Sequence, residues 1–290
     1  MAEQRQTGAG TLYVVATPIG NLGDLPPRAA EVLRRARAVV AEDTRRTLKL
    51  LAHIGVRAPA LLSLPAFDER GRIGPILERL RAGEEIALCT DAGTPGVSDP
   101  GQALVAAAWE AGARVVPVPG PSAALAALSA SGLPADRFLF VGFLPRKGAS
   151  RAETLAWLGK VPATLVLFEA GNRAAATLRD LEAALGDRPA ALARELTKLH
   201  EEIARGRLSE LAERFDAEVR GEVTLVVAGA EGEPAPKVEE DLDSELSRRL
   251  AAGEPPSTVA REVARARRLP RRAVYARLEA IKDLRGRLRS

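Results

Sequence analysis

Residues Glu85–Gly101 read EIALCTDAGTPGVSDPG, and this stretch decides the fold. Its apolar start, Ile86–Cys89, predicts a buried strand, and the apolar run Ala103–Trp109 that follows predicts a helix. The segment between them, Thr90–Pro100, is longer than the roughly 2–6 residues usual between a strand and a helix. Because ligands bind at the carboxyl ends of strands in open α/β sheets, we expect a ligand loop here.

The composition of this loop suits a small polar ligand. Gly93 places no side chain in the path of a ligand, and Asp91 and Thr94 offer hydrogen-bond acceptors and a donor. A simpler interpretation is that Ser98 or Asp99 only caps the following helix. Capping explains the end of the loop but not its length, so we favour the ligand loop.

The same pattern of a strand followed by a polar loop recurs along the first half of the chain, with helical runs between the strands. The further strands are expected at Thr11–Ala16, Ala38–Ala41, Leu61–Leu64 and Arg114–Val118. This alternation predicts an α/β fold with a parallel sheet covered by helices on both faces. The loops after the first, second, fourth and fifth strands are expected to converge on one crevice.

We expect three segments. An N-terminal α/β domain spans residues 1–133, a second α/β domain spans 134–232, and a small basic helical module resembling a helix-turn-helix spans 237–290. The break at Gly132–Pro134 marks the first boundary, and the composition of Glu231–Pro236 is that of a linker.

Two helix starts in the later part of the chain carry residues that favour capping. Asn172 is predicted to cap a helix over Arg173–Leu185, and Ser257 is predicted to cap a helix over Thr258–Arg265.

Composition argues against several classes of protein. The single cysteine, Cys89, cannot form an intramolecular disulfide, and its place in a predicted strand indicates a buried structural thiol. With two histidines and no HExxH or CxxC motif, we expect no metal site. No run approaches the ~18 apolar residues of a membrane span, and residues 1–10 lack the apolar core of a signal peptide, so we expect a cytoplasmic protein without membrane contact. The absence of GxxxxGK[ST], GxGxxG and GxSxG argues against P-loop, dinucleotide-binding and serine-hydrolase sites.

The net charge of +4 hides an asymmetry, because Ser257–Ser290 holds 11 Lys or Arg against 3 Asp or Glu. A basic tail on an acidic body predicts a module that faces nucleic acid. The alternative is a solvated helical tail in an arginine-rich chain. Six arginines are the candidates for phosphate contacts: Arg265, Arg267, Arg268, Arg271, Arg272 and Arg277.

Six motifs at the expected strand ends resemble those of a known family. They are Thr17–Leu22 (TPIGNL), Ala41–Arg45 (AEDTR), Thr90–Pro95 (TDAGTP), Pro119–Ala123 (PGPSA), Gly142–Pro145 (GFLP) and Ala193–Lys198 (ARELTK). In this order they resemble the ribosomal RNA small subunit methyltransferase I family of the tetrapyrrole methylase superfamily. The resemblance covers the chain from about residue 11 to 230.

The resemblance implies two α/β domains with S-adenosylmethionine in the cleft between them, and a homodimer. It implies 2′-O-methylation of the ribose of a cytidine in the decoding region of 16S rRNA, with the 30S subunit as partner. The cofactor loops of the family correspond here to Pro18, Gly20, Asp91, Gly93, Thr94, Ser122 and Ala123. Where the family usually has histidine this chain has Phe67 and Asn172, which argues against a mechanism that depends on histidine.

Methyl transfer from a sulfonium mainly requires alignment of acceptor and methyl group. Because a ribose hydroxyl is a weak acid, a base or a cation near its oxygen should help. The candidates for this role are Glu42, Arg45, Glu195 and Lys198, with Asp43 beside them, and the residues alone do not rank them.

Two other functions remain open at this stage. A related enzyme that acts on a tetrapyrrole usually carries a Gly-Gly-Asp-Pro version of the Asp91 loop and lacks a basic tail. A ribosome- or DNA-binding regulator without activity is the other, and the complete Asp91 loop counts against it.

Overall fold

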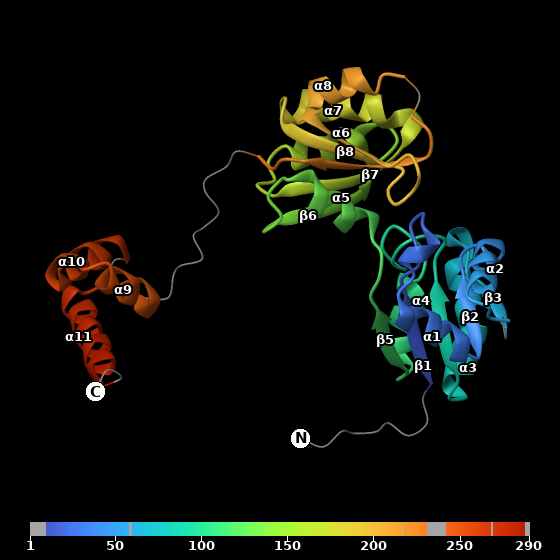
Figure 1. Cartoon of the computed structure of the whole chain (residues 1–290), viewed down its shortest axis with the longest axis horizontal. Helices are drawn as coiled ribbons and strands as arrows, with labels where there is room; N and C mark the ends of the chain where they lie inside the picture. Colours follow the sequence, from blue (N-terminus) through green and yellow to red (C-terminus); the bar gives the residue numbers. More distant parts are fainter. Residues whose placement is uncertain (1–9, 58–59, 218, 231–241, 268, 288–290) are drawn as a thin grey trace. The chain divides into compact units, whose positions relative to one another are not determined.

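In the computed structural model, the deciding apolar run forms β4 (Glu85–Cys89), the central strand of a five-stranded sheet with the order β3-β2-β4-β1-β5. Its neighbours are β1 (Thr11–Val15), β2 (Ala38–Ala41), β3 (Leu61–Ser63) and β5 (Arg114–Val118). All four pairings are parallel, which confirms the expected sheet (Figure 1). The carboxyl ends of its strands therefore lie at one edge.

The structure describes residues 10–57, 60–217, 219–230, 242–267 and 269–287, the last six of them by backbone alone. By their internal contacts they divide into two units, Met1–Ala230 and Glu231–Ser290. Within the described part of the chain, no helix is both long and apolar enough to cross a membrane.

Alternating side chains of the first sheet face two helical layers. Tyr13, Val15 and Val39 pack with α1 (Pro27–Arg35) and α2 (Thr44–His53). Their neighbours Leu12 and Val40 pack on the opposite face with α3 (Glu69–Arg81) and α4 (Gln102–Glu110). Two 3₁₀ turns, η1 (Leu22–Asp24) and η2 (Ala66–Asp68), lie in the loops after β1 and β3.

The second sheet has the order β6-β7-β10-β8-β9. Only the pair β6–β7 is parallel, so this sheet is mixed. Its strands are β6 (Phe138–Phe143), β7 (Thr164–Ala170), β8 (Pro189–Arg194), β9 (Glu202–Arg207) and β10 (Glu222–Val227). The helices α6 (Ala149–Leu158), α7 (Ala174–Leu185) and α8 (Leu208–Arg214) share one hydrophobic core with it.

The helix α5 (Ala123–Ser131) packs on the other face of the second sheet, although it directly follows β5 of the first (Figure 1). Its Ala127 and Leu128 contact a cluster that includes Val166 and Val226. The boundary expected at Leu133 stays a prediction, but the packing of α5 associates this helix with the second sheet.

Two expected caps are wrong. Asn172 lies inside the 3₁₀ turn η3 (Gly171–Arg173), and α7 begins after Arg173 without a side-chain cap. Ser257 lies within α10 (Pro256–Arg267) rather than before it, because the helix starts one residue earlier. Proline is favoured in the first turn of a helix, where its missing N–H costs nothing.

The C-terminal unit contains α9 (Leu242–Ala251), α10 and α11 (Arg271–Arg287) around a small core of its own. These three helices make up the described part of the segment expected to form a small helical module. The linker expected at Glu231–Pro236 lies outside the described residues.

Candidate functional site

The loops after β1 and β4 are joined by three hydrogen bonds. Thr17 and Gly93 exchange backbone bonds, with the Thr17 amide donating at 2.8 Å and the Gly93 amide at 3.1 Å. The Thr17 hydroxyl also donates to the carbonyl oxygen of Thr90 at 3.1 Å. Gly93 has φ of 82°, a conformation that favours glycine, so the turn that permits this pairing depends on its lack of a side chain.

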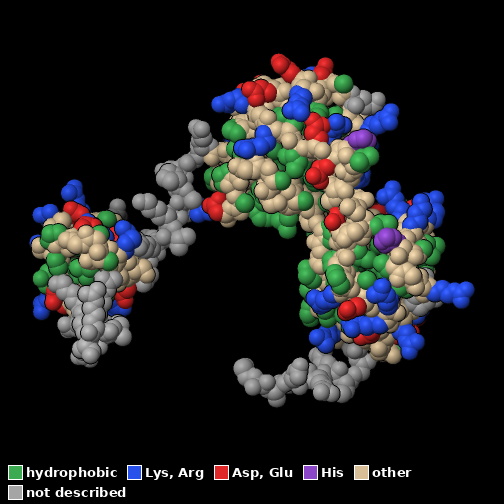
Figure 2. All heavy atoms as spheres, in the orientation of Figure 1, with side chains coloured by type: hydrophobic (Ala, Val, Ile, Leu, Met, Phe, Trp, Pro, Cys, Tyr) green, Lys and Arg blue, Asp and Glu red, His purple; other side chains and the backbone are tan. Residues whose placement is uncertain are grey.

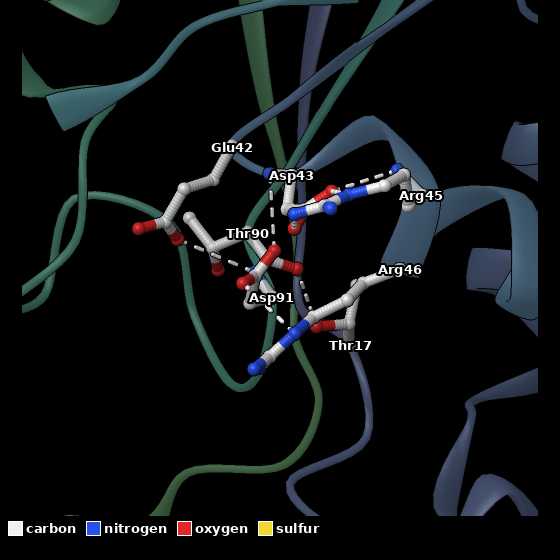
Figure 3. A network of polar contacts seen from close by, with 7 residues as sticks. All are labelled: Thr17, Glu42, Asp43, Arg45, Arg46, Thr90 and Asp91. Carbon is white, nitrogen blue, oxygen red and sulfur yellow. Dashed lines mark hydrogen bonds and ion pairs between the residues drawn. The ribbon is translucent and has the colours of Figure 1, made fainter.

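The loop after β2 is tied to the same place by Asp91. The backbone amide of Asp43 donates to Asp91 Oδ1 at 3.1 Å, and Arg46 Nε lies 3.3 Å from Asp91 Oδ2 (Figure 3). The Asp91 amide points toward Glu42 Oε2 at 3.5 Å, which is a long contact. The Asp91 carboxylate thus joins the loops after β2 and β4, and the loop after β1 is joined to the β4 loop through Thr90 and Gly93.

Arg45 turns away from Glu42 and toward its near neighbour in sequence. Its guanidinium donates to both oxygens of Asp43, at 3.0 and 2.7 Å, and its side chain is largely exposed (Figure 3). These hydrogen bonds lower the pKa of Asp43 to about 2. The Asp43 side chain also caps α2 through the Arg45 amide.

The loop after β5 reaches the same edge. A Cβ atom on Gly93 would lie 3.6 Å from Ile19 Cγ2 and 3.9 Å from the carbonyl oxygen of Pro121. Ser122 is the N-cap residue of α5, but its side chain makes no capping hydrogen bond, and Ala123 begins the helix. The convergence expected from the sequence is therefore present for the loops that hold Ile19, Asp91 and Pro121.

A contact from another helix caps α4. Glu69, the first residue of α3, accepts three hydrogen bonds at Oε1 from the amides of Gly101, Ala103 and Leu104, at 3.0, 2.9 and 3.2 Å. Neither Ser98 nor Asp99 caps the helix, since its N-cap is Gly101 without a side-chain cap of its own. The simpler interpretation of the loop is therefore wrong, and no local signal in the sequence links Glu69 to Gly101.

The loop after β8 touches the glycine turn after β1. The Asn21 amide donates to Thr197 Oγ1 at 3.0 Å, and a Cβ atom on Gly20 would lie 2.8 Å from both Lys198 Cγ and Thr197 Oγ1. Lys198 Nζ binds Glu195 Oε1 at 2.9 Å.

The backbone of the loop after β8 is strained. Glu195 and Thr197 have φ of 50° and 66°, values uncommon for residues with side chains. Such conformations persist where the surrounding structure enforces them, and they cluster at functional sites. Of the candidate residues in this loop, Lys198 lies beside the Gly20 turn, and Glu195 binds it.

Several carboxylates gather where these loops meet. Burial, then the carboxylates of Glu42, Asp91 and Glu222, raises the pKa of Asp99 to about 7. Burial, then Asp91, also raises the pKa of Glu42. Partly buried carboxylates that repel one another in this way favour a proton or a cationic ligand.

The hydroxyl oxygen of Thr90 lies near these carboxylates without a hydrogen bond to any residue that the structure describes. Its hydroxyl is buried and faces the Asp99 carboxyl, but among the described residues no group makes a hydrogen bond of normal geometry with Oγ1. A buried polar atom without a partner is rare and costs free energy, so it is a feature that a ligand can satisfy.

A buried network supports the strand end of β7. Glu169 is 2% exposed, and it accepts from the Thr177 hydroxyl at 2.6 Å and lies 3.3 Å from Arg173 Nη2. Arg151 donates to the same hydroxyl at 3.0 Å and to the carbonyl oxygen of Pro145 at 2.9 Å. The motif that begins at Gly142 is therefore held to the end of β7 by side chains.

A family model described as Tetrapyrrole (Corrin/Porphyrin) Methylases matches residues 11–212. A protein of Synechocystis sp. named ribosomal RNA small subunit methyltransferase I is 47% identical over 269 residues, which cover 92% of this chain and 96% of that protein. A protein of Thermotoga maritima with the same name is 44% identical over 223 residues, 77% of this chain and 100% of that protein.

Among solved structures, a uroporphyrin-III C-methyl transferase from Thermus thermophilus, complexed with S-adenyl homocysteine, has the same fold. It is 23% identical with a TM-score of 0.55, and the match covers 76% of this chain and 97% of that one.

Proposed function

Because this chain belongs to the ribosomal RNA small subunit methyltransferase I family of the tetrapyrrole methylases, we propose that it 2′-O-methylates the ribose of a cytidine in the decoding region of 16S rRNA. The cofactor is S-adenosylmethionine, and the reaction is the methylation of ribosomal RNA. The substrate that we infer is the rRNA within the 30S subunit, which places the protein in the cytoplasm.

One observation carries the cofactor site: the loops after β1, β2 and β4 are bonded to one another at Thr17, Asp43 and Asp91, and they enclose the unpartnered Thr90 hydroxyl. S-adenosylmethionine carries a sulfonium and an ammonium group, and the carboxylates of this crevice are complementary to both charges. The residues therefore fit the cofactor.

We assign the binding of the cofactor to residues of the converging loops. Gly93 and the Gly20 turn would approach it by their backbones, Asp91 and Thr94 would bind its polar groups, and α5 would face it with its first turn. The full set is Pro18, Gly20, Asp91, Gly93, Thr94, Ser122 and Ala123.

When bound, the cofactor supplies an activated methyl group, so the chain mainly orients the ribose hydroxyl and removes its proton. Glu42 is the candidate proton acceptor, because its carboxylate makes only a long contact with Asp91 and its pKa is raised. Lys198, held by Glu195, would stabilise negative charge on the oxygen. Arg45 is exposed at the rim of the crevice and would hold a phosphate of the substrate strand.

The test uses 30S subunits from a strain that lacks the modification, with S-adenosylmethionine carrying a labelled methyl group. We expect one methyl group per subunit, on the ribose of a single cytidine, as mapped by mass spectrometry and by resistance of the adjacent bond to alkali. Methylation of a base, or of a tetrapyrrole offered in place of the subunit, would contradict the proposal.

The catalytic roles are tested with Glu42→Gln, Arg45→Ala and Lys198→Met. Each should lower turnover of 30S subunits far more than the affinity for S-adenosylmethionine measured by calorimetry. Equal losses in rate and affinity would show that the residue only supports the loops. The proposed homodimer is tested separately by sedimentation equilibrium, where a monomer would contradict it.

A further inference from the structure

The basic C-terminal unit has a small core that determines which side of each helix is exposed. Val274 and Leu278 of α11 are fully buried against Leu246 of α9 and Val259 and Val263 of α10. Residues of α11 that lie away from this pair face outward, since positions three or four apart share a face of a helix.

The arginines of this unit fall into two groups. Arg267 binds Glu245 at 2.7 Å, Arg277 binds both oxygens of Asp243 at 2.7 and 2.8 Å, and Arg249 is held between two glutamates. These three guanidiniums connect the helices of the unit to one another. The six arginines expected to bind phosphate are therefore not equivalent, and Arg268 lies outside the described residues.

Arg271 and Arg272 belong to the other group. Both are exposed at the start of α11, and among the described residues neither has an acidic partner. Figure 2 shows that Lys and Arg side chains are spread over the visible face of this unit, with fewer acidic ones among them. Charge at these two positions is therefore available to a ligand.

A shallow hollow lies beside these two arginines. It has a volume of about 460 Å³ and is lined by Arg271, Arg272, Tyr275 and Ala276. Tyr275 is 42% exposed although it is aromatic, and Ala276 beside it in the lining has a small side chain. Arg271 and Tyr275 are four residues apart, so they lie on one side of α11.

We propose that this hollow is the place where the C-terminal unit binds RNA, with Arg271 and Arg272 on backbone phosphates and one base stacked on Tyr275. The inference rests on the proposed function, which supplies the RNA. Guanidiniums bind phosphate oxygens in pairs, and aromatic rings accept any base by stacking. Single-stranded RNA loops present unstacked bases in this way, whereas the deep major groove of duplex RNA excludes side chains.

The experiment measures binding of the full chain to 30S subunits by filter retention across a salt titration. In Arg271→Ala/Arg272→Ala, loss of two phosphate contacts should lower the slope of log affinity against log salt by about 1.4–1.8. The matched control is Arg261→Ala/Arg265→Ala, which removes the same charge from exposed positions of α10. Arg265 is one of the six candidate arginines but does not line the hollow, so the slope of this variant should change by less than half as much.

Tyr275 is tested on its own. Tyr275→Ala should weaken 30S binding by about 5- to 100-fold, while Tyr275→Phe keeps the ring and should bind like the wild type. A wild-type slope in Arg271→Ala/Arg272→Ala, an equal change in the control, or equal weakening by both Tyr275 variants would overturn the proposal. Tighter binding of a DNA duplex than of 30S subunits at the same salt would overturn it as well.

Failure of the proposed function is a separate result. If the wild-type chain binds 30S subunits through the hollow but transfers no methyl group to them, the catalytic proposal fails and the docking proposal stands. The thermal unfolding temperature and the affinity for S-adenosylmethionine should not change in any of these variants, because the residues that line the hollow are not part of the hydrophobic core of the C-terminal unit.

Discussion

The backbone amide of Asp43 donates a 3.1 Å hydrogen bond to the side chain of Asp91, and this bond joins the loops after β2 and β4. Asp91 was expected to bind the cofactor, yet both of its oxygens already serve the protein, since Oδ2 pairs with Arg46. Its carboxylate therefore has a structural role in addition to the proposed role in binding.

Asp91→Ala should accordingly lower the free energy of unfolding by about 1–3 kcal/mol as well as weaken S-adenosylmethionine binding. Arg46→Ala should cost at most about 1 kcal/mol, because that ion pair is largely exposed on the arginine side. Thr94→Ala should weaken binding without loss of stability. Urea unfolding and calorimetry on the three variants check this, and unchanged affinity in both Asp91→Ala and Thr94→Ala would remove the loop from the cofactor site.

Glu69 provides the second prediction, because one of its oxygens accepts from three amides at the start of α4. Glu69→Ala leaves these donors without an acceptor and should cost about 1–2 kcal/mol of stability. Glu69→Gln keeps an oxygen at the same place and should lose clearly less. Similar urea midpoints for the two variants would show that the contact with α4 contributes little.

Asp99 should make stability depend on pH. Its pKa is 3.8 in its ordinary state and about 7 in the fold, so between these values the folded chain holds a proton that the unfolded chain releases. The free energy of unfolding should therefore fall as pH rises from about 4 to about 7, and stay level above.

Asp99→Asn removes this dependence and should be more stable than the wild type at pH 8, with the difference vanishing near pH 4. Asp136→Asn changes an exposed carboxylate and serves as control. Urea unfolding at intervals across this range measures the effect. A wild-type pH profile in Asp99→Asn would show that Asp99 is not held in its protonated form by the crevice.

The loop geometry around Gly20 gives a steric prediction. A methyl group at this position would lie 2.8 Å from Lys198 Cγ and 2.9 Å from the carbonyl oxygen of Leu196. Gly20→Ala should push the two loops apart and reduce both cofactor affinity and turnover by at least about tenfold. Gly74→Ala, in α3 and directly before Pro75, is the control for affinity and turnover and should leave both unchanged. Wild-type kinetics in Gly20→Ala would show that the contact between the loops is not needed.

Much of the first sheet could be predicted because its strands are short apolar runs rich in β-branched residues and bounded by glycine and proline. The parallel direction of the strands follows from the helices between them. The strands β2 and β5 have the predicted bounds. Burial raises the pKa of the Cys89 thiol to about 12, which agrees with the structural role expected for it.

The wrong prediction of the α4 cap has a physical cause, which is that a distant part of the chain provides what a local residue was expected to provide. Glu69 replaces Ser98 or Asp99 as the cap of α4. Sequence patterns report local preference, and they carry no information on which side chain arrives from another element.

The last prediction concerns the part of the chain that is sufficient for the fold and the cofactor. A chain that ends at Glu233 should fold and bind S-adenosylmethionine, because the unit Met1–Ala230 contains both sheets and their cores, whereas the core of α9, α10 and α11 is separate. The shortened chain should have the same thermal unfolding temperature for this unit and the same calorimetric affinity for S-adenosylmethionine as the full chain.

The shortened chain should lose most of its affinity for 30S subunits, and the affinity that remains should depend less on salt. If it instead methylates 30S subunits at the full rate across a salt titration, the C-terminal unit is not the part that docks on RNA.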